Sequence, residues 1–305
     1  MEEEITLVTA YFDIGRGEWG KFKRGDNKYI SYFKLWARMK NKLIVYTNAE
    51  VAKEVLAIRE SYGLRDQTQV IVIDDVRSCD MDIYQKIEKT MQHPVSRRFH
   101  RHPNYPESFS PIFNYVVLLK PYFVGAVKAY LNTFVADAVK RNLVTGTAAW
   151  IDFGFNHGGE LFYKPEEFDY IWKYDFTDKI HIFTARELDD EPIFQVVKYM
   201  DVYIRGNLII AQDYRWAELW QLWRNAMVSL TDVGLSDDDQ TISLMAYRAK
   251  PELFEAHYMQ TWCLPLKLYG GEHFTMREEK KRSKVSLFFR NLEKKVKLKL
   301  REHDL

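Results

Sequence analysis

The sequence predicts an α/β protein in which a mostly parallel central sheet is flanked by helices. Short runs rich in β-branched and aromatic residues alternate along the chain with segments whose apolar residues recur at helical spacing. This alternation is typical of a parallel sheet with helices on both faces. The chain has 305 residues, of which 47% are hydrophobic and 15% aromatic, so it can bury one large core. We expect a single domain over residues 1–275 and a C-terminal tail over residues 276–305.

The expected elements begin with a strand, a loop and a helix. The stretch EITLVTAYF (4–12) is β-rich, and the Gly- and charge-rich stretch after it is a loop. Asp26 is placed as the N-cap of a helix whose apolar residues run from Tyr29 to Ala37. Residues 93–111 contain four prolines and predict a long loop. Further strands are expected at residues 42–48, 69–75, 147–152, 179–185 and 201–212, with helices between them.

The charge balance and the cysteines narrow the class of protein. The net charge is +1, whereas a general nucleic-acid binder shows a basic excess over the whole domain, so no nucleic-acid partner is expected. Cys79 and Cys263 match no zinc or redox spacing, which indicates ordinary thiols in a reducing compartment. The N-terminus MEEEITLV lacks the order of a secretion signal, and charges interrupt the apolar region 112–139. We expect a cytoplasmic protein without a membrane-spanning helix.

A lone carboxylate, Asp152, ends the apolar stretch AAWI and precedes the Gly-rich turn FGFNHGG. In open parallel sheets ligands bind beyond the carboxyl ends of the strands, and Asp152 is expected at such an end. The sequence has no P-loop pattern, and no dinucleotide-binding unit is expected, so a phosphate would be held otherwise. A divalent cation with carboxylate ligands can hold a nucleoside diphosphate, and Asp152 can supply one ligand. The alternative is that Asp152 caps the turn at Gly154.

The stretch SDDDQTISLM places three carboxylates before a Leu/Ile-rich helix. One interpretation is a solvated first turn that the helix dipole favours. The other rests on the residue pair Asp239 and Gln240, because acidic residues followed by Gln and such a helix are typical of enzymes that use sugar nucleotides. In those enzymes the pair lies beneath the sugar and the acceptor.

Several motifs in combination resemble those of GT-A glycosyltransferases. They are VTAYFD on the first strand, VYTN on the second, LLKPYF before AAWIDFG, then RGNLIIA and DDDQTISLM, and they occur in the order that this fold requires. More narrowly, TAYFDIGRGEW and WIDFG are similar to the HtrL/YibB-type family of bacterial proteins, which is associated with glycosyl transfer in surface-polysaccharide synthesis. The resemblance spans about residues 5–270 and implies a GT-A-like domain.

The resemblance also implies the residues of a donor site. The nucleotide base and ribose would contact Thr9, Tyr11 and Asn48, and the diphosphate would contact Arg16. Asp239 and Gln240 would lie beside the transferred sugar. In an inverting reaction one carboxylate would deprotonate an acceptor hydroxyl, and in a retaining reaction it would stabilise an oxocarbenium-like charge. The sequence leaves both stereochemical outcomes open.

A metal ion is part of what the resemblance implies. Asp152 would match the first acid of the Asp-x-Asp motif that binds Mn²⁺ or Mg²⁺. Gly154 stands where that motif has its second acid. The site would therefore be completed by another residue, His157 or His257, or it would be absent.

Two basic segments are candidates for binding anions. The first is RRFHRHP, in which Arg97, Arg98, His100 and Arg101 would clamp a phosphorylated glycan or a lipid-linked diphosphate; a plain solvated loop is the alternative. The second is the tail, where residues 277–305 carry 11 Lys and Arg against 5 Asp and Glu. A basic amphipathic helix over 277–301 is expected to dock on the anionic inner leaflet of the membrane. A helix folded back on the domain or bound to a partner is the alternative.

These observations predict a glycosyltransferase that is peripherally associated with the inner face of the cytoplasmic membrane. It would move a sugar from a nucleoside-diphosphate donor, UDP-linked, to a lipid-linked surface polysaccharide, a capsule or lipopolysaccharide precursor. Two alternatives remain, a non-catalytic glycan- or nucleotide-binding scaffold on the same fold and a nucleotidyltransferase. All three require that Asp152 and Asp239, 87 positions apart in the sequence, lie at one cavity.

Overall fold

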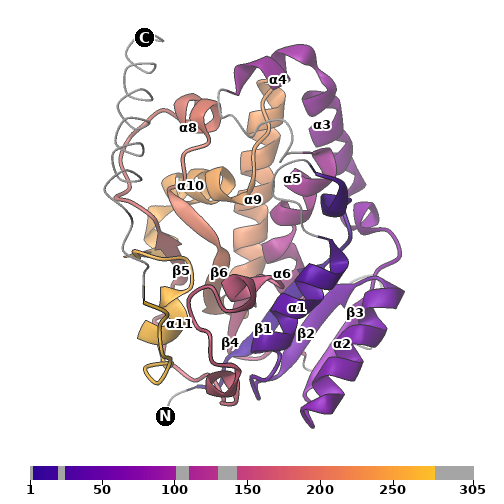
Figure 1. Ribbon diagram of the computed structural model, residues 1–305. Helices are drawn as coiled ribbons and strands as arrows, with labels where there is room; N and C mark the ends of the chain where they lie inside the picture. Colours follow the sequence, from indigo (N-terminus) through magenta and orange to yellow (C-terminus); the bar gives the residue numbers. More distant parts are fainter. Residues whose placement is uncertain (1–2, 20–24, 101–109, 130–142, 279–305) are drawn as a thin grey trace, which may run out of the picture. The chain divides into compact units, whose positions relative to one another are not determined.

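A seven-stranded sheet runs through the described part of the chain (Figure 1). The structure, a computed structural model, describes residues 3–19, 25–100, 110–129 and 143–278, apart from the side chains of Asp26, Arg97 and residues 125–129. The strand order is β3-β2-β1-β4-β6-β5-β7. The strands are β1 (Thr6–Tyr11), β2 (Leu43–Thr47), β3 (Thr68–Val72), β4 (Thr147–Ile151), β5 (Ile180–Thr184), β6 (Ile204–Gln212) and β7 (Phe254–Tyr258). All pairs are parallel except those of β6, which is antiparallel to β4 and β5. The mostly parallel sheet is therefore confirmed.

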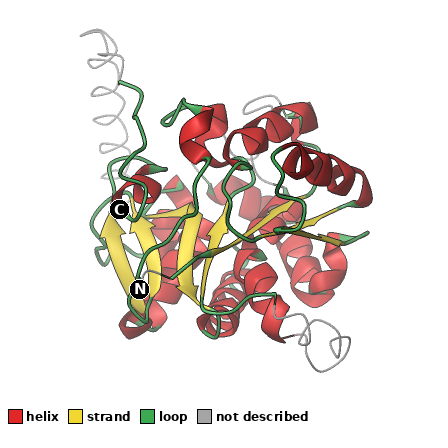
Figure 2. Cartoon of the chain, turned by 90° about the horizontal axis from the view of Figure 1, so that it is seen from below, coloured by secondary structure: helices red, strands yellow, loops and turns green. Residues whose placement is uncertain are grey.

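Helices cover both faces of this sheet (Figure 2). They are α1 (Asp26–Trp36), α2 (Ala49–Ser61), α3 (Met81–Gln92), α4 (Pro94–Phe99), α5 (Pro111–Leu118), α6 (Lys120–Ala129), α8 (Ile193–Tyr199), α9 (Arg215–Asp232), α10 (Asp239–Ala249) and α11 (Leu264–Leu268). Side chains alternate along each strand, so Ile44 of β2 belongs to one buried cluster and Val45 to the other. The first cluster packs on α3, α5, α6, α9 and α10, and the second on α1, α2 and α11.

Most of the expected elements are present, with two exceptions. The helix α4 lies inside the segment 93–111 that was expected to be a loop, because Pro94 occupies its first turn and the side chain of His93 caps it. The edge strand β7 was not expected at all. Its sequence FEAHY is short and carries two polar residues, so it has little of the apolar signal by which strands are recognised.

The large apolar side chains on α9 recur at helical spacing and are part of the core. Trp216 and Trp223 are fully buried, and Leu219, Met227 and Leu230 are buried beside them. This helix therefore anchors one face of the sheet.

The chain divides into two units, Met1–Thr275 and Met276–Leu305. The proposed amphipathic helix of the tail lies outside the described residues, apart from Arg277 and Glu278. Within the described part of the chain, no helix has the length and the apolar character needed to cross a bilayer.

Candidate active site

A cavity of about 210 Å³ lies where β1 and β4 end and α10 begins. The strand order reverses here, because β2 and β3 extend the sheet from one side of β1 while β4 lies on its other side. The crevice outside such a reversal is where ligands bind in open α/β sheets. The loops after β1 and β4, the helices α1, α5 and α6, the strand β6 and the start of α10 all contribute side chains to its wall. The cavity therefore lies at the strand ends where the sequence analysis expected the site.

The ammonium group of Lys120 lies between two carboxylates on the wall of this cavity. Its Nζ is 2.6 Å from Asp239 Oδ2 and 3.0 Å from Asp152 Oδ1, and it donates a hydrogen bond of 2.8 Å to the carbonyl oxygen of Gly206. The side chains of Lys120 and Asp239 are 7% and 6% exposed, whereas that of Asp152 is 36% exposed. Asp152 and Asp239 therefore converge at one cavity, as required, but through a lysine that the sequence analysis did not single out.

The charges in this cluster depend on one another. Burial alone lowers the pKa of the Lys120 ammonium, but the charges of Asp152 and Asp239 outweigh burial and raise this pKa above its usual value. Burial raises the pKa of the Asp239 carboxyl; Lys120 opposes that shift and the charge of Asp152 adds to it. Lys120 is thus held in its charged form, and Asp239 is a carboxylate with an increased affinity for a proton.

Gly206 permits the close packing around Asp239. A Cβ atom on Gly206 would lie 1.7 Å from Asp239 Oδ2, which is far inside van der Waals contact. The strand β6 can therefore pass beside the carboxylate, and offer its carbonyl to Lys120, only with glycine at this position.

Asp152 points into the cavity and does not cap the following turn with its side chain. Its Oδ1 accepts a 2.8 Å hydrogen bond from Trp150 Nε1 in addition to the ion pair with Lys120. The turn is closed instead by the backbone, where the amide of Phe155 donates to the carbonyl of Asp152. The alternative of an Asx cap at Gly154 is therefore wrong, and Asp152 is available to a ligand.

The acidic stretch before α10 caps the helix and also lines the cavity. Asp238 is the N-cap, and its Oδ1 accepts a hydrogen bond from the amide of Gln240 at 3.0 Å. Asp237 is buried and accepts a 2.7 Å hydrogen bond from Thr241 Oγ1. Asp238, Asp239 and Gln240 line the cavity, whereas Asp237 does not. The first turn of α10 is thus built into the cavity wall and is not a solvated helix end.

The other end of the cavity combines one cation with aromatic rings. Arg16 lines the cavity and donates a hydrogen bond from Nη1 to Tyr29 Oη. Its guanidinium lies 4.8 Å from the ring centroid of Trp19 and 5.6 Å from that of Phe113. Tyr11 also lines the cavity, with its ring 5.0 Å from that of Tyr29. Of the four residues expected to bind the nucleotide, Tyr11 and Arg16 therefore lie at the site.

The other two, Thr9 and Asn48, do not line the cavity. Thr9 is fully buried within β1. Asn48 is the N-cap of α2, where its Oδ1 accepts a hydrogen bond from the amide of Val51 at 2.9 Å. Their expected contacts with a nucleotide are not supported by their positions.

The stretch GRGEWG (15–20) has the glycine spacing of a dinucleotide-binding turn. That turn must follow a strand directly and open a helix. Here Arg16–Glu18 form one turn of 3-10 helix, β1 ends at Tyr11 and α1 begins at Asp26. The spacing therefore does not mark a dinucleotide site.

His257 does not belong to this cavity. It lies on β7, and the strands β6 and β5 separate β7 from β4, whose end carries Asp152. Three strand spacings amount to roughly 14 Å, which is too far for both side chains to hold one ion. The expectation that His257 completes a metal site with Asp152 is therefore wrong.

His157 lies at the cavity rim, in a turn with unusual backbone angles. Asn156 and His157 have φ values of 58° and 43°, and the buried side chain of Asn156 holds the turn by accepting hydrogen bonds from the amides of Leu161 and Phe162 at 2.9 and 3.0 Å. The side chain of His157 is 44% exposed, and its Nδ1 lies 2.7 Å from Glu160 Oε2. His157 therefore faces a surface carboxylate.

The side chains around Asp152 can be compared with the ligands that Mn²⁺ or Mg²⁺ requires. Hard divalent cations require several oxygen ligands around one point. Gly154 has no side chain, and the carboxylate of Asp239 is already bridged to Asp152 by the ammonium of Lys120. The side chains described around Asp152 therefore do not form a divalent-cation site, because a lysine occupies the position between the acids.

The basic segment after α3 is only partly described. Arg98 is exposed on α4, whereas His100 is buried, with its Nδ1 3.1 Å from the carbonyl of Val197. Arg101 and the side chain of Arg97 lie outside the described residues. His100 is therefore packed inside the protein, and the expectation that it clamps an anionic acceptor is wrong.

Lys120, Gly206 and Trp262 are among the cavity residues that the sequence analysis did not single out as site residues. Lys120 had a visible signal, because it interrupts the most apolar region of the chain just before Pro121. A lysine in such a setting is buried only when it is paired. Gly206 and Trp262 carry no comparable signal in a single sequence.

The family match and the relative HtrL agree with the resemblance of TAYFDIGRGEW and WIDFG to the HtrL/YibB-type family. A family model described as "Bacterial protein of unknown function (HtrL_YibB)" matches residues 3–269. The protein HtrL of Escherichia coli (strain K12) is 31% identical over 274 residues, which cover 85% of this chain and 89% of HtrL. A crystal structure of mouse xyloside xylosyltransferase 1 in its apo form has 12% identity and a TM-score of 0.38, with 83% of this chain and 85% of that chain covered. By the extent of the family match and the identity to HtrL, this chain belongs to the HtrL_YibB family.

Proposed function

We propose that the cavity binds a nucleoside-diphosphate sugar, UDP-linked, and that the protein transfers the sugar to a hydroxyl group of a growing surface glycan. The observation that carries this proposal is the cluster of Asp152, Lys120 and Asp239 in a cavity at the reversal of strand order. Such crevices bind nucleotides in many α/β proteins, and a paired carboxylate at their wall supplies a group for proton transfer.

The cavity offers chemically distinct surfaces for the parts of such a donor. The rings of Tyr11 and Tyr29 are flat apolar surfaces on which a base or a sugar can stack. Arg16 provides a planar fork of donors for phosphate oxygens. Asp239 and Gln240 offer an acceptor and a donor for the hydroxyl groups of a sugar.

Lys120 gives the proposal its electrostatic basis. Two ionised carboxylates at the cavity wall would repel a diphosphate, and the ammonium between them compensates part of their charge. With Arg16 on the same cavity, the cations needed to stabilise a departing diphosphate come from the protein itself. The proposed reaction therefore requires no divalent ion at Asp152.

The proposed chemistry needs one proton acceptor. The oxygen of the acceptor hydroxyl forms a bond to the anomeric carbon, the bond from that carbon to the diphosphate oxygen breaks, and the hydroxyl proton passes to a carboxylate. Asp239 suits this role because burial raises its pKa. Positioning of both substrates supplies the remainder of the rate enhancement.

The test combines ligand binding with turnover. Nucleoside diphosphates and their sugar conjugates are screened by thermal shift with Mn²⁺ and with EDTA, and release of the diphosphate is measured with glycan acceptors. We expect a UDP-sugar to raise the melting temperature equally under both conditions, because a ligand of the native state stabilises by mass action. Asp239→Asn should retain this shift and lose about 100-fold or more in turnover.

The matched control is Asp232→Asn, which removes an exposed carboxylate paired with Lys86. It should leave both binding and turnover unchanged. If no diphosphate nucleotide shifts the melting temperature, the glycosyltransferase proposal fails. Binding without turnover would favour the scaffold, and pyrophosphate release from a nucleoside triphosphate and a sugar phosphate would favour the nucleotidyltransferase.

A further inference from the structure

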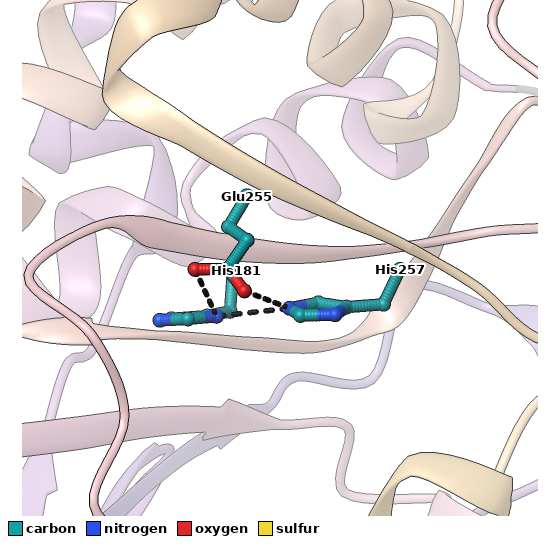
Figure 3. Close-up of side chains that lie close together, drawn as sticks. All are labelled: His181, Glu255 and His257. Atoms are coloured by element: carbon teal, nitrogen blue, oxygen red, sulfur yellow. Dashed lines mark hydrogen bonds and ion pairs between the residues drawn. The ribbon is translucent and has the colours of Figure 1, made fainter.

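A second cluster of polar side chains lies on β5 and β7, the two strands that follow β6 at the edge of the sheet. His181 lies opposite Glu255 in the parallel register of the two strands, and His257 follows two residues after Glu255. All three side chains therefore extend from the same face of the sheet. Figure 3 shows them pointing toward one another, with two ring nitrogens and the carboxylate around a common point.

The distances within this cluster are close to those of a metal site. His181 Nδ1 lies 2.9 Å from His257 Nε2, and the carboxylate oxygens of Glu255 lie 3.9 and 3.8 Å from these two atoms. Two ligand atoms at 2.1 Å from one ion are about 3.0 to 3.4 Å apart for angles between 90° and tetrahedral. A small rotation of the Glu255 carboxylate, which is 41% exposed, would bring the third ligand to the same spacing.

Each of the three side chains is also held at its outer end. His181 Nε2 lies 3.0 Å from the carbonyl oxygen of Thr177, so this nitrogen carries the proton and Nδ1 presents a lone pair. His257 Nδ1 lies 2.9 Å from Tyr269 Oη, and Thr177 Oγ1 donates to Glu255 Oε2. Such outer partners orient the ligands in metalloproteins and are a regular part of their sites.

The surroundings of both imidazoles favour the neutral form. The rings of Phe176, Phe183 and Tyr269 pack around the two histidines. Burial lowers the pKa of His181 and of His257, and the neighbouring His181 lowers that of His257 further. Neutral imidazole is the form that binds a metal ion.

We propose that His181, Glu255 and His257 bind one divalent transition-metal ion of the zinc type. Two imidazoles and one carboxylate form a ligand set that Zn²⁺ accepts, with solvent in the remaining position beside the exposed Glu255. A hard cation such as Mg²⁺ prefers oxygen ligands and is disfavoured by the two nitrogens. This site is independent of the proposed transfer reaction.

The position of the site gives the ion a structural role. It would join the edge strand β7 to β5, and β7 leads directly to residues 259–262. The carbonyls of Met259 and Gln260 accept hydrogen bonds from Arg205, the carbonyl of Trp262 accepts one from Asn207, and Trp262 lines the cavity. The ion would therefore brace the strand that leads to Trp262, one of the residues that line the cavity.

The test is a titration of the untagged, full-length chain with Zn²⁺ after removal of metal by EDTA and dialysis. We expect one equivalent to bind by calorimetry, an increase in melting temperature, and a visible absorption band when Co²⁺ replaces Zn²⁺. His257→Gln and Glu255→Gln should each weaken binding by about tenfold or more. His273→Gln, which alters a histidine whose Nε2 contacts the carbonyl of Glu167, should bind as the unaltered protein does.

Two further measurements keep the outcome unambiguous. Glu255 is partly exposed at a sheet edge, so Glu255→Gln should fold even if His257→Gln does not, and circular dichroism checks this. Asp239→Asn should bind Zn²⁺ normally, which separates this site from the cavity. Absence of saturable binding at one equivalent, or equal binding by Glu255→Gln and the unaltered chain, would overturn the proposal.

Discussion

Replacement of Lys120 by methionine tests the central feature of the cavity. Lys120→Met keeps an unbranched side chain of similar length but removes the ammonium that compensates Asp152 and Asp239. Asp239 is then left buried beside Asp152 without a cation. The carbonyl of Gly206 also loses the hydrogen bond that Lys120 donates at 2.8 Å.

The size of the effect follows from the burial of the pair. Removal of one partner from a buried ion pair costs about 3 to 5 kcal/mol, because the other charge is left uncompensated. This cost applies in full to Asp239, because its side chain is only 6% exposed. The side chain of Asp152 is 36% exposed, so water screens its charge when the ammonium is removed. We therefore expect Lys120→Met to lower the free energy of unfolding by about 3 kcal/mol.

The assay is equilibrium unfolding in urea of Lys120→Met and of the double variant Lys120→Met, Asp239→Asn. The second substitution removes the uncompensated charge, so it should restore about 1 kcal/mol or more of the lost stability. Lys86→Met is the control, because Lys86 and Asp232 form an exposed pair at 3.0 Å with side chains 49% and 60% exposed. This control should cost less than about 1 kcal/mol.

Two results would refute the reasoning. If Lys120→Met loses no more stability than Lys86→Met, then the buried ammonium does not hold the site together. If Asp239→Asn lowers the stability of Lys120→Met further, then the unpaired carboxylate is not the source of the loss.

The remaining predictions concern a close contact and a buried histidine. Gly206→Ala places a Cβ 1.7 Å from Asp239 Oδ2 and should lower the free energy of unfolding in urea by about 2 to 3 kcal/mol. The control Gly17→Ala, whose Cβ would have its nearest contact at 3.6 Å, should lower it by less than about 1 kcal/mol. Equal losses in the two variants would contradict the close contact at Gly206. Burial lowers the pKa of His100 to about 4, so its contribution to stability is complete above the usual pKa of about 6.5 and is lost as the pH falls toward 4. We therefore measure the free energy of unfolding in urea at pH 7.5 and at pH 5. Between these pH values His100→Gln should lose about 2 kcal/mol less stability than the unaltered chain. An equal loss of stability in both proteins would contradict this prediction.

The sheet was predictable because its strands carry strong local signals. The strands β2 and β4 are almost entirely apolar, and β6 contains the apolar run LIIA; such runs indicate strands buried on both faces. Asp152 and Asp239 were also placed correctly, since one ends a strand and the other begins a helix. The carboxyl ends of parallel strands meet at one edge of a sheet, which predicted the position of Asp152. The position of Asp239 at the same cavity was predicted from the resemblance of the DDDQTISLM motif.

The pairing of elements distant in sequence was not predictable in the same way. Lys120 contacts carboxylates 32 and 119 positions further along the chain, and no local pattern identifies such partners. His257 was assigned to the wrong site because β7 was not recognised and its place at the sheet edge was unknown. Asn48 had a local explanation, a helix N-cap, that competed with its expected contact to a nucleotide.

The anchoring of Lys120 has a consequence for fragments of the chain. Its three acceptors belong to the end of β4, to β6 and to the first turn of α10, so the charge cluster spans residues 120–239. A piece cut anywhere within that interval would lack at least one acceptor or the ammonium itself. The charge cluster is therefore a property of the assembled domain, and complementation by two separately expressed halves would have to rebuild it before the proposed substrate could bind.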